Sequence, residues 1–145
     1  MTDDDARLLA ELDRLDAAVR TAPAGDTTAQ IALWQHVTRL PQWFFIARGS
    51  AEQPRPYGVA FDQGPVVCLY SSAARARDAA RALGLADAAT DVPVYGVPLP
   101  AAIDYVAAFE QAGVFGVAVD HPLLGHWIPL ANLGVLKRWL GGSAG

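Results

Sequence analysis

The sequence predicts an α+β fold in which a mixed sheet of five to six strands packs against helices. Three observations support this prediction. Amphipathic helix patterns occupy the two ends of the chain, short apolar runs separated by turn signals occupy the middle, and an alanine-rich helix pattern directly follows one of these runs. The chain has 145 residues, of which 52% are hydrophobic and 18% charged, which suits one compact domain with a buried core. The predicted order of elements is ααβββαβαβα.

The first predicted helix covers residues 2–20. Three aspartates at 3–5 lie in its first turn, where negative charge suits the helix dipole. Its apolar residues form one narrow stripe: Leu8, Leu12, Leu15 and Val19. Residues 21–26 contain a proline and a glycine and resemble a linker, so we expect residues 1–22 to form a loosely attached helix. Such a helix usually docks on its own domain, but the same stripe is our candidate interface for a second copy.

Residues 27–40 predict a second helix. Thr27 and Gln30 fit a capping box at its start. Its apolar face consists of Ile31, Trp34 and Val37. Leu40-Pro41 ends the helix, because the residue before a proline disfavours the helical conformation.

Three strands are predicted next, and we expect them to form an antiparallel meander. Residues 43–47 are a continuous aromatic and aliphatic run, which is typical of a buried strand. Residues 57–61 and 66–70 follow as a hairpin. The sequence Asp-Gln-Gly at 62–64 fits a three-residue turn with glycine in the left-handed conformation.

A helix and an irregular strand come after the hairpin. Ser71 or Ser72 caps the helix, whose interior is rich in alanine. Gly84 and Leu85 match a Schellman ending. The strand at 92–97 contains a proline and a glycine, which favours an edge position.

The last third of the chain completes the fold. Its predicted elements are a helix at 100–113, a strand at 115–119, a short strand at 126–128 and a helix at 132–140. The strand–helix–strand connections on both sides of residues 92–97 favour parallel pairing. We therefore expect one domain at 27–140, and a disordered tail at 141–145, where glycine and serine are frequent.

Composition disfavours several classes of function. The formal net charge is −4 and no block of Lys and Arg is present, which argues against nucleic-acid binding. No apolar run approaches the roughly 18–20 residues that span a membrane, so we expect no membrane association. Cys68 is the single cysteine, and the acidic N-terminus does not resemble a secretory signal. We therefore predict a cytoplasmic protein without an internal disulfide.

The sequence contains no recognised catalytic signature. Nucleophile-elbow, Walker and His-Glu-x-x-His patterns are missing, and no pair of carboxylates is placed for acid–base chemistry. Cys68 lies between apolar neighbours in a predicted strand, which is typical of an inert buried thiol. We therefore predict no catalytic residues and no cofactor.

The loop at 120–127 is the best candidate for ligand binding. It follows a predicted strand, and ligands often bind beyond the carboxyl ends of parallel strands. The candidate residues are Asp120, His121, His126 and Trp127. Imidazole and carboxylate groups suit zinc, but this histidine spacing is not a recognised ligand pair, so we predict no metal. An ordinary polar turn is the alternative. Trp127 and Trp139 could also border a groove, because tryptophan is a favoured anchor at interfaces.

Several stretches between Trp43 and Leu140 resemble the N-terminal domain of the SseB family of bacterial proteins. They are Trp43-Phe44-Phe45-Ile46-Ala47, Asp62-Gln63-Gly64-Pro65, Val66-Val67-Cys68-Leu69-Tyr70-Ser71-Ser72, Phe115-Gly116-Val117-Ala118-Val119-Asp120 and His126-Trp127-Ile128-Pro129. That family is named for a serine-sensitivity phenotype and is sometimes linked to type III secretion. No established enzyme mechanism accompanies it, and fuller members have two domains where this chain has the length of one.

The resemblance implies a non-enzymatic binding or adaptor domain. We expect its partner to be another protein or a second copy of the chain. The alternative is a domain that binds a small ligand or a metal through the 120–127 loop, with weak hydrolytic activity.

Overall fold

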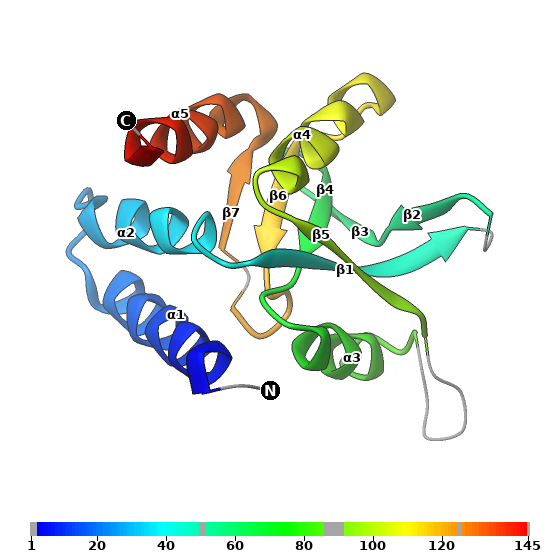
Figure 1. The fold of residues 1–145 in the computed structure, drawn as a ribbon, viewed down its shortest axis with the longest axis horizontal. Helices are drawn as coiled ribbons and strands as arrows, with labels where there is room; N and C mark the ends of the chain where they lie inside the picture. Colours follow the sequence, from blue (N-terminus) through cyan, green and yellow to red (C-terminus); the bar gives the residue numbers. More distant parts are fainter. Residues whose placement is uncertain (1–2, 50–51, 86–91, 125, 145) are drawn as a thin grey trace.

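A computed structural model describes residues 3–49, 52–85, 92–124 and 126–144. Gly125 of the predicted loop and Gly145 of the predicted tail lie outside the described residues. The elements, in chain order, are α1 (Asp3–Thr21), α2 (Thr28–Val37), β1 (Gln42–Gly49), β2 (Pro54–Pro56), β3 (Gly58–Phe61), β4 (Gly64–Leu69), α3 (Ala73–Ala82), β5 (Val94–Pro98), α4 (Ala101–Ala107), the 3₁₀ helix η1 (Ala108–Ala112), β6 (Gly116–Val119), β7 (His126–Pro129), the 3₁₀ helix η2 (Leu130–Asn132) and α5 (Leu133–Ala144) (Figure 1).

The described strands form two sheets, and the predicted α+β class is confirmed. One sheet has the order β2-β1-β5, and the other has the order β3-β4-β6-β7. Pairing is antiparallel except between β4 and β6, which are parallel. The prediction of parallel pairing on both sides of β5 was wrong, because β5 pairs antiparallel with β1 in the other sheet.

The predicted three-stranded meander was also wrong, because the chain changes sheets between β2 and β3. Tyr57 makes this change: its N–H donates to Ile46 O (2.8 Å), while its own carbonyl accepts from Cys68 N–H (3.0 Å). The two sheets meet again where Phe44 and Tyr70 exchange both backbone hydrogen bonds, at 2.9 and 2.7 Å. Strand β1 thus pairs with β2 near its end and, at Phe44, with Tyr70, the residue that follows β4.

The β3–β4 hairpin forms as predicted, with a tighter turn. Phe61 pairs with Gly64, so only Asp62 and Gln63 lie between the paired residues. Gly64 has φ +144°, which glycine adopts readily.

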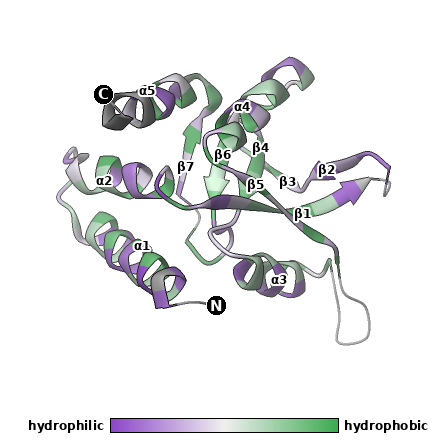
Figure 2. Ribbon diagram, viewed as in Figure 1, coloured by the Kyte–Doolittle hydropathy of each residue, from purple (hydrophilic) through white to green (hydrophobic). Residues whose placement is uncertain are grey.

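Strand β4 is covered on both faces, which explains its continuous apolar sequence. Val67 and Leu69 belong to the larger core, and the helices α1, α2, α4 and α5 also contribute to it. Cys68 and Tyr70 point to the opposite face and join a smaller core under α3. Figure 1 shows α1, α2 and α5 on one side of the molecule and α3 below β1 and β5. In Figure 2, α1 and α3 carry both hydrophilic and hydrophobic residues, whereas β4 is largely hydrophobic.

Helix α1 packs on the rest of the chain through its apolar stripe. Leu12 and Leu15 are buried in the larger core, and Leu8 and Val19 pack against it. This arrangement corresponds to docking on the protein's own domain.

The ends of the helices follow local chemistry. The Ser72 side chain accepts from Arg75 N–H (3.1 Å) and caps α3. The Schellman ending is confirmed: Gly84 has φ +77°, and Leu85 N–H donates to Ala80 O (2.8 Å).

Two other helix ends differ from the prediction. The predicted capping box was wrong, because Thr27 makes no side-chain cap bond, and Asp26 Oδ1 instead accepts from Thr28 N–H (3.0 Å). Helix α5 continues to Ala144, beyond the predicted end at residue 140. In the described part of the chain, no helix combines the length and the hydrophobicity that a membrane span requires.

Candidate functional site

Asp120 lies where the parallel strands β4 and β6 end. Its carboxylate is 1% exposed and is held by three donors. Oδ1 accepts from Ser71 N–H (2.7 Å), and Oδ2 accepts from Ser71 Oγ–H (2.6 Å) and from Arg75 Nη1 (2.8 Å). A buried carboxylate that accepts three hydrogen bonds mainly stabilises the fold.

The backbone of Asp120 has a left-handed conformation with φ +52°. Aspartate tolerates this region better than most residues, but it still carries strain. Two backbone hydrogen bonds fix the residue: its N–H donates to Leu69 O (2.9 Å), and its carbonyl accepts from Leu124 N–H (2.8 Å). The sharp bend turns the Asp120 side chain toward Ser71 and α3.

Arg75 connects the Asp120 site to helix α1. Its Nη2 donates to both carboxylate oxygens of Asp13, each at 2.8 Å. Burial opposes the positive charge of Arg75, but the hydrogen bonds with Asp120 and Asp13 outweigh it and raise the pKa of the guanidinium. No pattern in the sequence indicates this link, because Asp13 and Arg75 are distant in the chain and belong to different helices.

His126 also contacts α1. Its Nε2 lies 2.7 Å from Asp16 Oδ1, which in turn accepts from Arg20 Nε at 2.9 Å. The i,i+4 ion pair of Asp16 and Arg20 is therefore part of a larger contact between α1 and β7.

His121 and Trp127 lie in a different place and pack on Phe61. The ring centroids are 5.8 Å apart for His121 and Phe61, and 6.0 Å apart for Trp127 and Phe61. Burial lowers the pKa of His121. The four residues predicted as a ligand site therefore do not converge on one point. Within the described residues, no group of three metal-ligating side chains is placed to hold an ion.

Cys68 is fully buried in the core under α3. Burial raises the pKa of its thiol to about 12, so the thiolate is scarce at neutral pH. This side chain is not available as a nucleophile.

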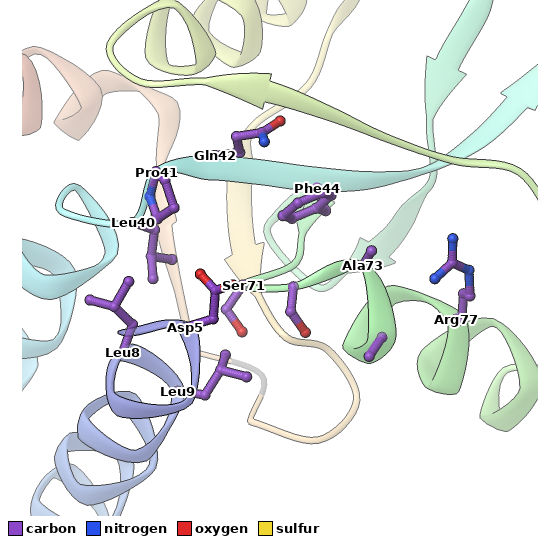
Figure 3. Close-up of a pocket in the computed structure, with 12 residues that line it drawn as sticks. Asp5, Leu8, Leu9, Leu40, Pro41, Gln42, Phe44, Ser71, Ala73 and Arg77 are labelled. Atoms are coloured by element: carbon purple, nitrogen blue, oxygen red, sulfur yellow. The ribbon is translucent and has the colours of Figure 1, made fainter. Parts of the chain in front are cut away.

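A pocket of about 360 Å³ lies between the start of α1 and the start of α3 (Figure 3). Leu8 and Leu9 of α1 line one side, and Phe44 and Arg77 line the other. Its serines are already engaged: Ser71 bonds to Asp120, and Ser72 caps α3. The hydrogen bonds of these two serines therefore stabilise the fold itself.

A second pocket, of about 390 Å³, lies between α2 and α5, which pack beside each other in Figure 1. We call it the α2–α5 groove. Its apolar walls are Ile31, Trp34, Ile128, Val135, Leu136 and Trp139, and its polar residues are Thr27, Gln30 and Asn132. Trp139 thus borders a groove, as the sequence suggested.

Two features distinguish the α2–α5 groove from ordinary surface. Ile31 is 45% exposed, which is high for a large aliphatic side chain. Trp34 is 2% exposed, and its Nε1–H has no hydrogen-bond partner among the described residues. Buried indole N–H groups usually have an acceptor, so this donor is unsatisfied in the free protein.

The charged residues of the two groove helices are basic. Helix α2 contains no Asp, Glu, Lys or Arg, and α5 contains Lys137 and Arg138 but no acidic residue. The imidazole of His36 in α2 faces inward, where its Nε2 donates to Leu8 O (2.7 Å). Neither Lys137 nor Arg138 lines the groove, and Lys137 instead pairs with Asp104 of α4 at 2.9 Å, so the described lining of the groove is uncharged.

Comparisons with known proteins give no family. No protein-family model matches this chain, and a search of curated proteins gives no significant match. The resemblance to the SseB family therefore stays a prediction.

Proposed function

We propose that this protein is a non-catalytic adaptor domain that binds a partner protein in the α2–α5 groove. The observation that carries the proposal is the groove itself, with exposed Ile31 and the unsatisfied Nε1–H of Trp34. Aromatic anchors in apolar grooves dominate the energy of many interfaces. The buried Cys68 and the fully bonded Asp120 support a role without catalysis.

The proposed occupant is an amphipathic helix of the partner that presents its apolar face to the groove. A groove between two helices suits apolar residues spaced i, i+3, i+4 and i+7 on a third helix. We propose that this binding occurs in the cytoplasm, where a free thiol such as that of Cys68 stays reduced.

The test is binding by the full chain with one charge placed in the groove. Ile31→Glu puts a carboxylate at a 45% exposed position, so the fold is expected to tolerate it. Leu123→Glu is the matched control, because Leu123 is 63% exposed and lies outside the groove lining. Immobilised wild type and both variants are incubated with extract from the native cells. The retained partner is then purified, and its affinity for each form is measured.

We expect wild type and L123E to bind the purified partner equally, and I31E to bind it at least tenfold more weakly. The binding segment, made as a peptide, should change the tryptophan fluorescence of wild type. Equal binding of the partner by I31E would contradict the proposal. If light scattering instead reveals a dimer that I31E dissociates, the groove holds a second copy of the chain and the proposed partner is wrong.

A further inference from the structure

A hollow of about 580 Å³ is bordered by the β3–β4 hairpin and the 3₁₀ helix η1, and it shares no lining residue with the α2–α5 groove. We call it the β3–η1 hollow. Its walls include the apolar residues Ala60, Val67, Phe109 and Val114 and, where β1 and β2 border it, Arg48 and Arg55. The volume lies within the range of about 300–1,000 Å³ that is usual for small-molecule sites.

Small residues of β3 leave the hollow open. Successive side chains of a strand point to opposite faces of the sheet. Val59 packs against the smaller core, so Gly58 and Ala60 belong to the other face, which carries Val67 of the larger core. Gly58 is the direct partner of Val67 in the pairing of β3 with β4. Gly58 and Ala60 are both exposed, and they are too small to fill the space beside η1.

Two arginines meet at the hollow without a counter-charge. Arg48 in β1 is directly opposite Arg55 in β2, so the two side chains lie on the same face of this strand pair. Both are exposed, and neither forms an ion pair in the part of the chain that the structure describes. No Asp or Glu belongs to the described lining of the hollow. Like charges directly opposite each other destabilise a strand pair, so a bound anion would relieve the repulsion.

The hollow joins these cations to apolar walls, which suits an amphipathic acid. The planar fork of an arginine guanidinium matches the two oxygens of a carboxylate. Phe109 and Val114 pack against the larger core and also line the hollow, so they offer an apolar surface next to the arginines. A purely polar anion would leave this surface uncovered, and a neutral apolar molecule would leave the arginines unpaired.

We propose that the β3–η1 hollow binds a small organic acid with an apolar body, whose carboxylate pairs with Arg48 and Arg55. The apolar body lies over Ala60 and packs against Phe109 and Val114. Because the α2–α5 groove shares none of these residues, the site is a second binding function beyond the proposed adaptor role.

The experiment uses three probes. Phenylbutyrate carries both a carboxylate and an apolar body, phenylbutyramide has nearly the same shape without the charge, and acetate has the charge without the body. Each is titrated into the ¹⁵N-labelled full chain, and amide shifts are followed by NMR. We expect phenylbutyrate to give saturable shifts at Gly58, Ala60 and Val67. It should bind roughly tenfold more tightly than phenylbutyramide, because hydrogen bonds between charged groups are lost in the amide, and roughly tenfold more tightly than acetate, which buries no apolar body.

Variants at exposed positions make the outcome decisive. Arg48→Gln and Arg55→Gln should each weaken phenylbutyrate roughly three- to tenfold and leave phenylbutyramide unchanged. Arg138→Gln is the matched control, because Arg138 is exposed and lies outside the lining. Ala60→Leu fills the hollow and should weaken both phenyl probes roughly tenfold. Ala74→Leu, exposed on α3 outside this lining, should bind as wild type.

The proposal is overturned if phenylbutyrate gives no saturable shifts at these amides, or if it binds no more tightly than phenylbutyramide or acetate. It is also overturned if A60L binds the phenyl probes as tightly as wild type. If R138Q weakens phenylbutyrate as much as R48Q and R55Q do, the overall charge attracts the probe and the proposed site is wrong. Because Ile31 does not line this hollow, I31E should leave probe binding unchanged, which separates this test from that of the groove.

Discussion

The buried carboxylate of Asp120 accepts both the backbone N–H and the side-chain hydroxyl of Ser71, at 2.7 and 2.6 Å. These two residues follow the parallel strands β4 and β6, so the pair of bonds joins the ends of both strands. Arg75 extends the link to Asp13 on α1. One carboxylate thus connects the central sheet, α3 and the N-terminal helix.

Replacing Asp120 by Asn should destabilise the protein by about 3 kcal/mol. Asparagine also tolerates the left-handed backbone, so the change mainly removes the negative charge. It leaves Arg75 half-buried with less compensation and puts an amide donor among groups that all donate. Urea unfolding followed by circular dichroism measures the change.

Asp13→Asn is the matched control for that experiment. Asp13 bonds to the same arginine, but its side chain is 54% exposed. Exposed ion pairs contribute little, so D13N should cost under about 1 kcal/mol. A similar loss in D13N and D120N would contradict the central role of Asp120.

Truncating Leu12 to Ala should lower the free energy of unfolding by about 2–5 kcal/mol, because Leu12 is 0% exposed and lies in the larger core. Leu9→Ala, on the same helix but outside the core cluster, should cost under about 1 kcal/mol. Thermal unfolding of the full chain measures both. If the two variants have the same melting temperature, α1 does not contribute to the cooperative core in the way that the burial of Leu12 implies.

The local parts of this fold were predictable because they depend on neighbouring residues. The Ser72 cap, the Schellman ending at Gly84 and the β3–β4 hairpin all follow from a few consecutive side chains. Periodicity placed the stripe of α1, and the structure then shows Leu12 in the core.

The pairing of strands was less predictable because it depends on contacts between distant segments. The shift of the chain at Tyr57 from one sheet to the other leaves no local pattern. The same holds for the candidate sites. Asp120 was singled out from its position after a strand, but its partners Ser71, Arg75 and Asp13 come from other elements.

Removing the hydroxyl of Tyr70 should not destabilise the protein. Because this buried Oη has at most the thiol of Cys68 as a partner, and a thiol is a weak acceptor, Tyr70→Phe should change stability by between 0 and about +1 kcal/mol. Tyr95→Phe is the matched control, since the Tyr95 hydroxyl lies 2.5 Å from that of Tyr105. Losing this bond should cost about 1 kcal/mol. Chemical unfolding compares the two, and a larger loss in Y70F would mean that its hydroxyl is satisfied in the free protein.

The thiol of Cys68 should resist labelling in the native protein. Its pKa of about 12, against an ordinary value of 9.0, makes the thiolate about 1,000-fold rarer at pH 8, and burial adds a steric barrier. Ellman's reagent should therefore react over hours without denaturant and within minutes in 6 M guanidinium, where the chain is unfolded. Rapid labelling of the native protein would show that Cys68 is accessible.

His121 should make the protein less stable as the pH falls through the range of histidine titration. Burial lowers the pKa of His121 below its ordinary value of 6.5, so the unfolded chain takes up this proton at a higher pH than the native one. The contribution of His121 is constant above the unfolded pKa of about 6.5, and it decreases as the pH falls from there toward the lower native pKa. NMR titration of the imidazole should give a pKa below 6.5. His121→Gln should reduce the loss of stability between pH 7 and pH 5 in urea unfolding, relative to wild type. A native pKa at or above 6.5 would contradict the burial of this ring against Phe61.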